Sequence, residues 1–263
     1  MSAPPVAPSP LHRPYAESAA RVDLREAPAN GARAHEFDVV SRGDFVPGRL
    51  DRPTSGDALP LALVLGGSDA WTAGTDRGLA IARIDLPLLG HRQSPKLTDR
   101  LRSGHDRLLR DLPLDADTRA LVEEFARQSV SDVVRTLEAL GAEAGIDASR
   151  TALIGVGLGA SAAAWALPFA KGLTACAIAG PARALSDEGL DPVAPIAAAD
   201  LGPLQVRLQV DASEVEAGST RALADALPGA AAPIALDAET SEGELSAGDL
   251  SATLDFVANA LTR

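Results

Sequence analysis

Residues 151–161 read TALIGVGLGAS, and this stretch decides how the chain folds. An apolar run ending at Ile154 leads into three glycines at alternate positions, Gly155, Gly157 and Gly159, and then into an alanine-rich segment. A continuous apolar run is typical of a buried strand in a parallel sheet. Alternate glycines predict a turn that leaves no room for side chains. We therefore predict a buried strand, a sharp turn and a helix in direct succession.

The spacing of the three glycines is that of the nucleophile elbow, a G-x-S-x-G turn whose central serine attacks the substrate. Gly155 and Gly159 fall where that turn has its glycines, but the central position is Gly157 and carries no side chain. Ser161 lies four residues later, in the first turns of the predicted helix, so we expect a helix-surface or packing serine. The pattern predicts the turn without its nucleophile.

Composition limits the classes of function. The chain has 263 residues, 46% of them hydrophobic, and a formal net charge of −12. An acidic balance disfavours nucleic acid and anionic membranes as partners. The single cysteine, Cys176, lies in an apolar run and is expected to be a small buried core residue; it excludes a disulfide within the chain and a cysteine-based zinc site. We predict no metal and no cofactor.

The organisation of the chain predicts one domain. Residues 1–20 read as a flexible Pro/Ala-rich arm with no secretory signal, and residues 21–263 as a single α/β domain in the cytoplasm. No apolar run approaches the ~20 residues that span a bilayer. A dinucleotide-binding interpretation fails, because the glycines do not follow the G-x-G-x-x-G spacing.

Strand and helix patterns alternate after the first hairpin. This order predicts a mostly parallel sheet with its functional pocket at the carboxyl ends of the strands. The expected strands are residues 34–41 and 45–50, forming an antiparallel hairpin, then 61–65, 80–85, 152–154, 173–179, 204–210 and 233–236. The expected helices are residues 115–141 (or to 145), 161–170, 216–227 and 250–261.

Four further segments carry a family resemblance. They are residues 84–92 (IDLPLLGHR), 125–132 (FARQSVSD), 137–140 (LEAL) and 146–150 (IDASR). With the elbow, they resemble the dienelactone-hydrolase-like and acyl-esterase-like branch of the α/β-hydrolase superfamily, over about residues 36–262. The resemblance implies the α/β-hydrolase fold, with a mostly parallel central sheet, an N-terminal antiparallel hairpin and helices on both faces.

The resemblance also implies a catalytic triad, in the chain order nucleophile, acid and histidine. The acid is expected near Ser213, where Asp211 and Glu214 are candidates; both also suit the cap and first turn of a helix. The histidine is expected within residues 237–248 (DAETSEGELSAG), which contain none. The four histidines are His12, His35, His91 and His105. The triad is therefore degenerate at more than one position.

The loop after the strand at 61–65 would form the oxyanion pocket in this fold. We expect Gly66, Gly67, Ser68, Asp69, Trp71 and Leu158 around that pocket. Trp71 has two interpretations, since it either lines a ligand or packs. The short spacing to the next strand predicts a first crossover helix that is short or absent.

Three functions remain open. The first is a pseudoenzyme that binds a small ligand, or docks a protein partner, in the former catalytic pocket; a homo-oligomer is compatible with this. The second is acid–base chemistry such as isomerisation, cyclisation or elimination, with His91 as the acid or base and Asp211, Glu214 or another carboxylate beside it. His91 is alternatively a residue that braces its loop. The third, ranked lowest, is residual hydrolysis with water as the nucleophile.

Overall fold

The computed structural model describes residues 20–28, 33–66, 68–180, 182–187, 189–229, 232–236 and 244–262. These residues build a nine-stranded sheet in the order β1-β2-β3-β5-β4-β6-β7-β8-β9. Almost all of the predicted arm at residues 1–20 lies outside the described residues. The strands are β1 (Val22–Ala27), β2 (Arg33–Ser41), β3 (Asp44–Arg52), β4 (Leu59–Leu65), β5 (Ala80–Ile84), β6 (Ile146–Val156), β7 (Leu173–Ala179), β8 (Gln205–Val210) and β9 (Ile234–Ala235).

The sheet has an antiparallel part and a parallel part. Strands β1, β2, β3 and β5 pair antiparallel in that spatial order. From β5 through β4 and β6 to β9, every pair is parallel. All seven residues of β4 are buried, as expected for a strand covered on both faces. The mostly parallel sheet with an N-terminal hairpin confirms the predicted architecture.

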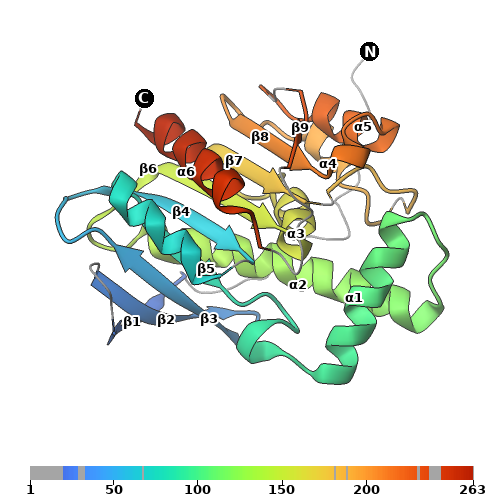
Figure 1. Cartoon of the computed structure of the whole chain (residues 1–263). Coiled ribbons are helices and arrows are strands. Elements are labelled where there is room, and N and C mark those ends of the chain that lie inside the picture. The colour runs from blue at the N-terminus through green and yellow to red at the C-terminus, as the bar shows by residue number, and fades with distance from the viewer. Residues whose placement is uncertain are drawn as a thin grey trace, which may run out of the picture.

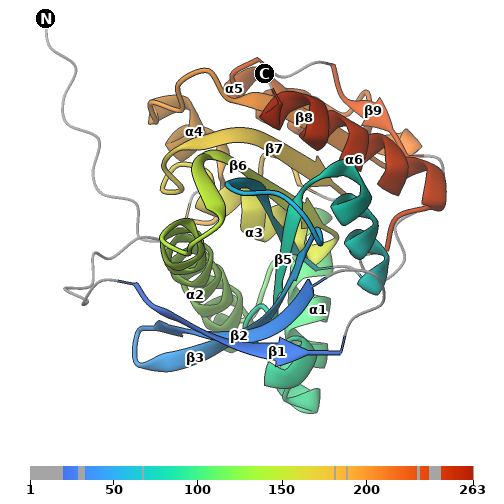
Figure 2. The same ribbon diagram turned by 90° about the vertical axis from the view of Figure 1, so that its left-hand side faces the viewer.

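Helices cover both faces of the sheet (Figures 1 and 2). Helices α1, α2 and α3 contribute to the larger core cluster on one face, and α6 packs with the 3-10 helix η1 over the other. The helices are α1 (Pro95–Leu109), α2 (Ala116–Gly141), α3 (Leu158–Ala166), α4 (Val193–Ala198), α5 (Gly218–Ala226) and α6 (Ala247–Leu261), with η1 (Asp69–Arg77), η2 (Gly90–Arg92) and η3 (Ala212–Glu214).

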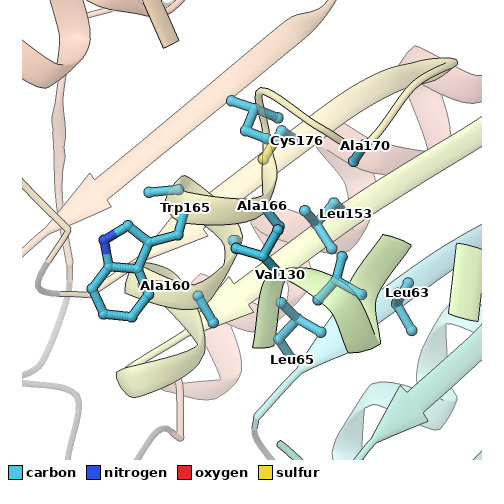
Figure 3. Close-up of a cluster of buried hydrophobic side chains, with 14 of the residues drawn as sticks. Leu63, Leu65, Val130, Leu153, Ala160, Trp165, Ala166, Ala170 and Cys176 are labelled. Carbon is cyan, nitrogen blue, oxygen red and sulfur yellow. The ribbon is translucent and has the colours of Figure 1, made fainter. Parts of the chain in front are cut away.

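The larger core lies where α3 and α2 meet the parallel strands. Figure 3 shows Trp165, Val130, Leu65 and Leu153 among the buried side chains of this cluster. Cys176 belongs to the same core, and burial raises the pKa of its thiol to about 12. A thiol that stays protonated among apolar side chains is unreactive, so the predicted structural role of Cys176 holds.

Helix α1 and strand β1 were not expected. The buried face of α1 consists of Thr98, Leu101, Gly104, His105 and Leu108, so only two of its members are large apolar residues. A helix whose buried face contains glycine and histidine shows only a weak 3.6-residue periodicity of apolar residues in its sequence. The crossover between β4 and β5 is the single 3-10 helix η1, as the short spacing predicted.

None of the helices in the described ranges combines the length and apolar character needed to cross a membrane.

Candidate functional site

The elbow has the predicted geometry. Strand β6 ends at Val156, α3 begins at Leu158, and Gly157 between them has φ 59° and ψ −122°. Its N–H donates to the Ala179 carbonyl at 3.0 Å, which ties the turn to the end of β7. A non-glycine residue is strained in this backbone conformation. Glycine adopts this conformation without strain. Gly157 therefore makes the sharp turn of an elbow but provides no side-chain atom that could act as a nucleophile.

The outer glycines are required by close contacts. A Cβ on Gly155 would lie 2.3 Å from the Gly159 carbonyl oxygen, and a Cβ on Gly159 would lie 1.9 Å from the Leu65 carbonyl oxygen. Contacts this short are excluded for real Cβ atoms. The two glycines thus let α3 pack directly against β6 and β4, which fixes the elbow in place.

The predicted oxyanion loop is described in part. Gly66 directly follows β4 and has φ +86°. The Ser68 hydroxyl caps η1 by accepting a hydrogen bond from the Ala70 N–H. Gly67 lies outside the described residues. Asp69 accepts a hydrogen bond from Arg83 at 2.5 Å, and this bond lowers the pKa of the Asp69 carboxyl. Leu158 is half-buried and opens α3, where the first N–H groups have no partner within the helix.

Trp71 is a core residue, and its position fits the second of its two interpretations, that it packs. Its side chain is 2% exposed and packs in the cluster between η1, α6 and the sheet. Trp165 is also a core residue, and its Nε1 donates to the Leu190 carbonyl at 2.7 Å.

The acid candidates lie at the carboxyl end of β8. Asp211 precedes η3 and Glu214 is the last residue of η3, which are the positions that the capping interpretation expects, but the Asp211 side chain makes no capping hydrogen bond. Both line a cavity of about 230 Å³ together with Arg183 and Thr220. Arg183 approaches Glu214 at 3.9 Å and Asp111 at 3.6 Å.

His91 is bound to Asp85. The Asp85 Oδ2 accepts the backbone N–H of His91 and lies 2.8 Å from His91 Nδ1. Gly90 has φ +55°, and a Cβ there would lie 2.1 Å from Asp85 Oδ1, so glycine is needed for the loop to wrap around the carboxylate. Asp85 therefore caps its own loop. The His91 side chain is 92% exposed, and its Nε2 is not used in this contact.

A cavity of about 590 Å³ lies beside this loop. It brings His91 together with Asp85, Asp69 and Gly66 of the sequence-based candidates. Asp211 and Glu214 line the smaller cavity instead, so the structure does not bring them to His91. The other lining residues are Arg25, Glu36, Phe37, Pro47, Gly48, Arg49, Arg83, Ile84, Leu86, Leu89, Gly90 and Arg102.

A buried ion pair holds the His91 loop to the rest of the fold. Arg92 donates to Asp132 of α2 at 2.7 Å and to the Asp85 carbonyl at 3.1 Å. Arg42, at the turn between β2 and β3, lies 3.7 Å from the other Asp132 oxygen. Burial raises the pKa of Asp132, and Arg92 opposes this shift. The segment 125–132, chosen from sequence for its resemblance, therefore anchors the loop that carries His91.

Sequence reasoning missed the contact between His105 and Ser161. The His105 Nε2 lies 2.9 Å from the Ser161 Oγ, and both side chains are buried between α1 and α3. Burial lowers the pKa of His105 to about 4, so the imidazole is neutral near pH 7. The sequence analysis did not predict helix α1, which carries His105, so nothing in it pointed to this contact. Ser161 is thus a packing serine with a polar partner.

The described residues contain no group of three or more histidine, cysteine, aspartate or glutamate side chains that could bind a metal ion together.

The strand order, the glycine elbow and the helices on both faces define the α/β-hydrolase fold. Solved structures with this fold superpose on most of the chain. A cold-adapted esterase from an Arctic intertidal metagenomic library matches with a TM-score of 0.62 and 18% identity, over 90% of this chain and 97% of that one. The sequence matches no protein-family model and no curated protein sequence.

Two dienelactone-hydrolase-like structures give the same result. A putative dienelactone hydrolase from Klebsiella pneumoniae has a TM-score of 0.55 and 18% identity, over 85% of this chain and 90% of that one. A dienelactone hydrolase-like promiscuous phosphotriesterase from metagenomic libraries has a TM-score of 0.62 and 15% identity, over 89% and 98%. At these identities the likeness establishes the fold, and function must be argued from the site.

Proposed function

We propose that this protein binds a small molecule and does not perform the serine-dependent hydrolysis associated with its fold. The observation that carries the proposal is Gly157. It occupies the nucleophile's position with φ 59° and ψ −122°, and it has no side chain. Hydrolysis through a covalent intermediate requires a nucleophilic side chain at that point.

The histidines support the same conclusion. No histidine follows residue 105 in the sequence, whereas the triad needs one near the carboxyl terminus. His105 is buried against Ser161, and His91 is bound to Asp85 on a different loop. The missing base and the missing nucleophile are independent losses, so a single substitution does not account for them.

The larger cavity is the proposed binding site. Its volume of about 590 Å³ falls within the range of ~300–1,000 Å³ that is usual for small-molecule sites. It adjoins Gly66 at the carboxyl end of β4 and Asp85 just after β5, the edge of an open α/β sheet where ligands bind. Replacement of a crossover helix by η1 is compatible with this opening.

Two measurements test the proposal. The purified protein is expected to hydrolyse p-nitrophenyl acetate no faster than bovine serum albumin does, and not to be labelled by a fluorophosphonate probe. Native mass spectrometry of gently purified protein is expected to show a bound small molecule that denaturation releases. Labelling of any serine together with turnover would contradict the loss of hydrolysis.

A second candidate is favoured by the contact of His91 with Asp85. A carboxylate on Nδ1 orients an imidazole and leaves Nε2 free for proton transfer, the arrangement used by a general base. Under this alternative, the released molecule would be converted by the wild-type protein and unchanged by His91→Gln, with His35→Gln as the control. Unchanged NMR spectra of that molecule after incubation with wild-type protein would favour binding alone.

A further inference from the structure

The wall of the 590 Å³ cavity carries a row of charged residues on neighbouring strands. Arg25 of β1 faces Glu36 of β2, which faces Arg49 of β3, which faces Arg83 of β5. Directly opposed residues in a sheet have Cβ atoms about 4.5–5.5 Å apart on one face. Three guanidinium groups and one carboxylate therefore project from one continuous surface.

Asp51 fixes two of these arginines. Its side chain is 2% exposed, accepts a hydrogen bond from Arg49 Nε at 3.0 Å, and lies 3.4 Å from Arg83 Nη2. Arg83 also donates to Asp69 through Nη1. A buried carboxylate shared by two guanidinium groups limits the conformations they adopt. The arginines are thus held in position before any ligand arrives, which lowers the entropy cost of binding.

Hydrogen-bond donors remain unused around the cavity. Arg102 projects from α1 at the cavity rim and has no hydrogen-bond or ion-pair partner among the described residues. Each guanidinium carries five N–H donors and no acceptor. By contrast, the carboxylates of Asp69 and Asp85 already accept hydrogen bonds from Arg83 and His91.

Part of the lining is apolar. The ring of Phe37 covers Gly48 on the adjacent strand, where a Cβ would lie 2.3 Å from the ring Cζ. Pro47 and Leu89, which are both half-buried, line the same cavity, whereas Phe37 and Leu86 are each 1% exposed. A ligand that uses the whole site would therefore combine an apolar body with a group that accepts several hydrogen bonds.

We propose that the cavity binds a small organic anion, with a carboxylate or phosphate group held by Arg102 and the arginine row, and an apolar body against Pro47 and Leu89. Arginine forks match the oxygen geometry of both anions. This inference rests on the proposed binding function and adds the chemical class of the ligand. The cavity is lined by four arginines and by three carboxylates, Glu36, Asp69 and Asp85, so its lining carries a slight positive excess within a chain of net charge −12.

Matched pairs of fragments test the inference. Benzoate is compared with benzamide, and phenyl phosphate with phenol, by ligand-observed NMR titration in 50 mM and 500 mM NaCl. At least one anion is expected to bind, its neutral partner at least tenfold more weakly, and the anion's Kd to rise in high salt. The two pairs also distinguish a carboxylate site from a phosphate site.

Two variants of α1 locate the binding. Arg102→Gln is expected to raise the Kd of the bound anion about tenfold, whereas Lys96→Gln, which makes the same charge change at an exposed position on the same helix, changes it less than twofold. Equal effects of the two variants, equal binding of the neutral fragments, or no binding of either anion at millimolar concentration would each overturn the inference.

Failure of the proposed function and failure of the anion preference give different experimental results. If the wild-type protein hydrolysed phenyl acetate and benzoate inhibited that reaction through Arg102, the anion site would stand and the loss of hydrolysis would be wrong. If benzamide bound as tightly as benzoate and no ester were cleaved, the binding function would stand and the anion preference would be wrong.

Discussion

The Nε2 atom of His105 lies 2.9 Å from the Oγ atom of Ser161, and the two residues join α1 to α3 inside the protein. A serine and a histidine in contact suggest catalysis, but this pair lies one helical turn beyond the elbow tip and both side chains are buried. Its imidazole is neutral near pH 7 because burial lowers the pKa to about 4. The pair therefore stabilises the packing of two helices.

Acid is expected to destabilise the protein through His105. Its pKa of about 4 in the folded protein is below the ordinary histidine value of 6.5, so the unfolded state binds the proton more readily. Stability from the neutral imidazole is complete above about pH 6.5 and is lost as pH falls toward 4. Urea unfolding at pH 7.5 and pH 5 should differ by about 2 kcal/mol from this group alone, at 1.36 kcal/mol per pKa unit.

Two variants separate this effect from other titrations. His105→Leu should remove most of the loss of stability between pH 6.5 and pH 5, whereas His91→Gln, at an exposed site, should leave it unchanged. Equal pH dependence in the His105→Leu variant and the wild type would contradict the assignment.

Serine at position 157 is expected to restore the shape of the motif without its reaction. Gly157→Ser should leave p-nitrophenyl acetate hydrolysis at background, because no histidine follows residue 105. It should also lower the free energy of unfolding by about 1–3 kcal/mol, since a side chain at φ 59° and ψ −122° is strained. Gly157→Ala is the control and should show the same loss of stability. Turnover well above background in Gly157→Ser alone would refute the prediction.

The close approach at Gly159 makes a sharper test of the fold. Gly159→Ala places a Cβ 1.9 Å from the Leu65 carbonyl oxygen, so β4 and α3 must separate. We expect a loss of more than about 3 kcal/mol, beyond the usual range for single substitutions, measured by urea unfolding or as loss of folded protein. Gly218→Ala, where a Cβ meets nothing within 4 Å, should change stability by less than about 0.5 kcal/mol. Similar losses in the two variants would count against the elbow geometry.

Removing Arg92 from the buried ion pair should lower the free energy of unfolding more when the charge of Asp132 is present than when it is absent. Arg92→Ala leaves Asp132, which is fully buried, without its 2.7 Å partner and should cost about 3–5 kcal/mol of unfolding free energy. In an Asp132→Asn background the same substitution should cost much less, because no buried charge remains. A double-mutant cycle by chemical denaturation measures the difference. Additive losses would show that the two residues do not interact.

The parallel half of the sheet was predictable from sequence, since a strand buried on both faces is a continuous apolar run. Strand β7 is Leu173–Ala179, the predicted range, and α2 ends at Gly141, one of its two predicted ends. The elbow was equally clear, because its three glycines lie within five residues of sequence, between an apolar run and an alanine-rich segment.

The site was less predictable, because its residues come together only in three dimensions. Helix α1 was missed because His105 and Gly104 occupy its buried stripe. Its omission hid both the partner of Ser161 and Arg102 at the cavity rim. The arginine row was invisible for a related reason, since Arg25, Arg49 and Arg83 are distant in sequence and become neighbours only through strand register.

The replacement of a crossover helix by η1 has a consequence for the order of folding. Strands β4 and β5 pair in parallel, yet only residues 66–79 separate them. The entropy cost of closing a loop grows with its length, so this pair joins at lower cost than β4 with β6, which are separated by residues 66–145. The proposed ligand cavity is therefore bordered by strand pairs that can assemble early, before the elbow itself is in place.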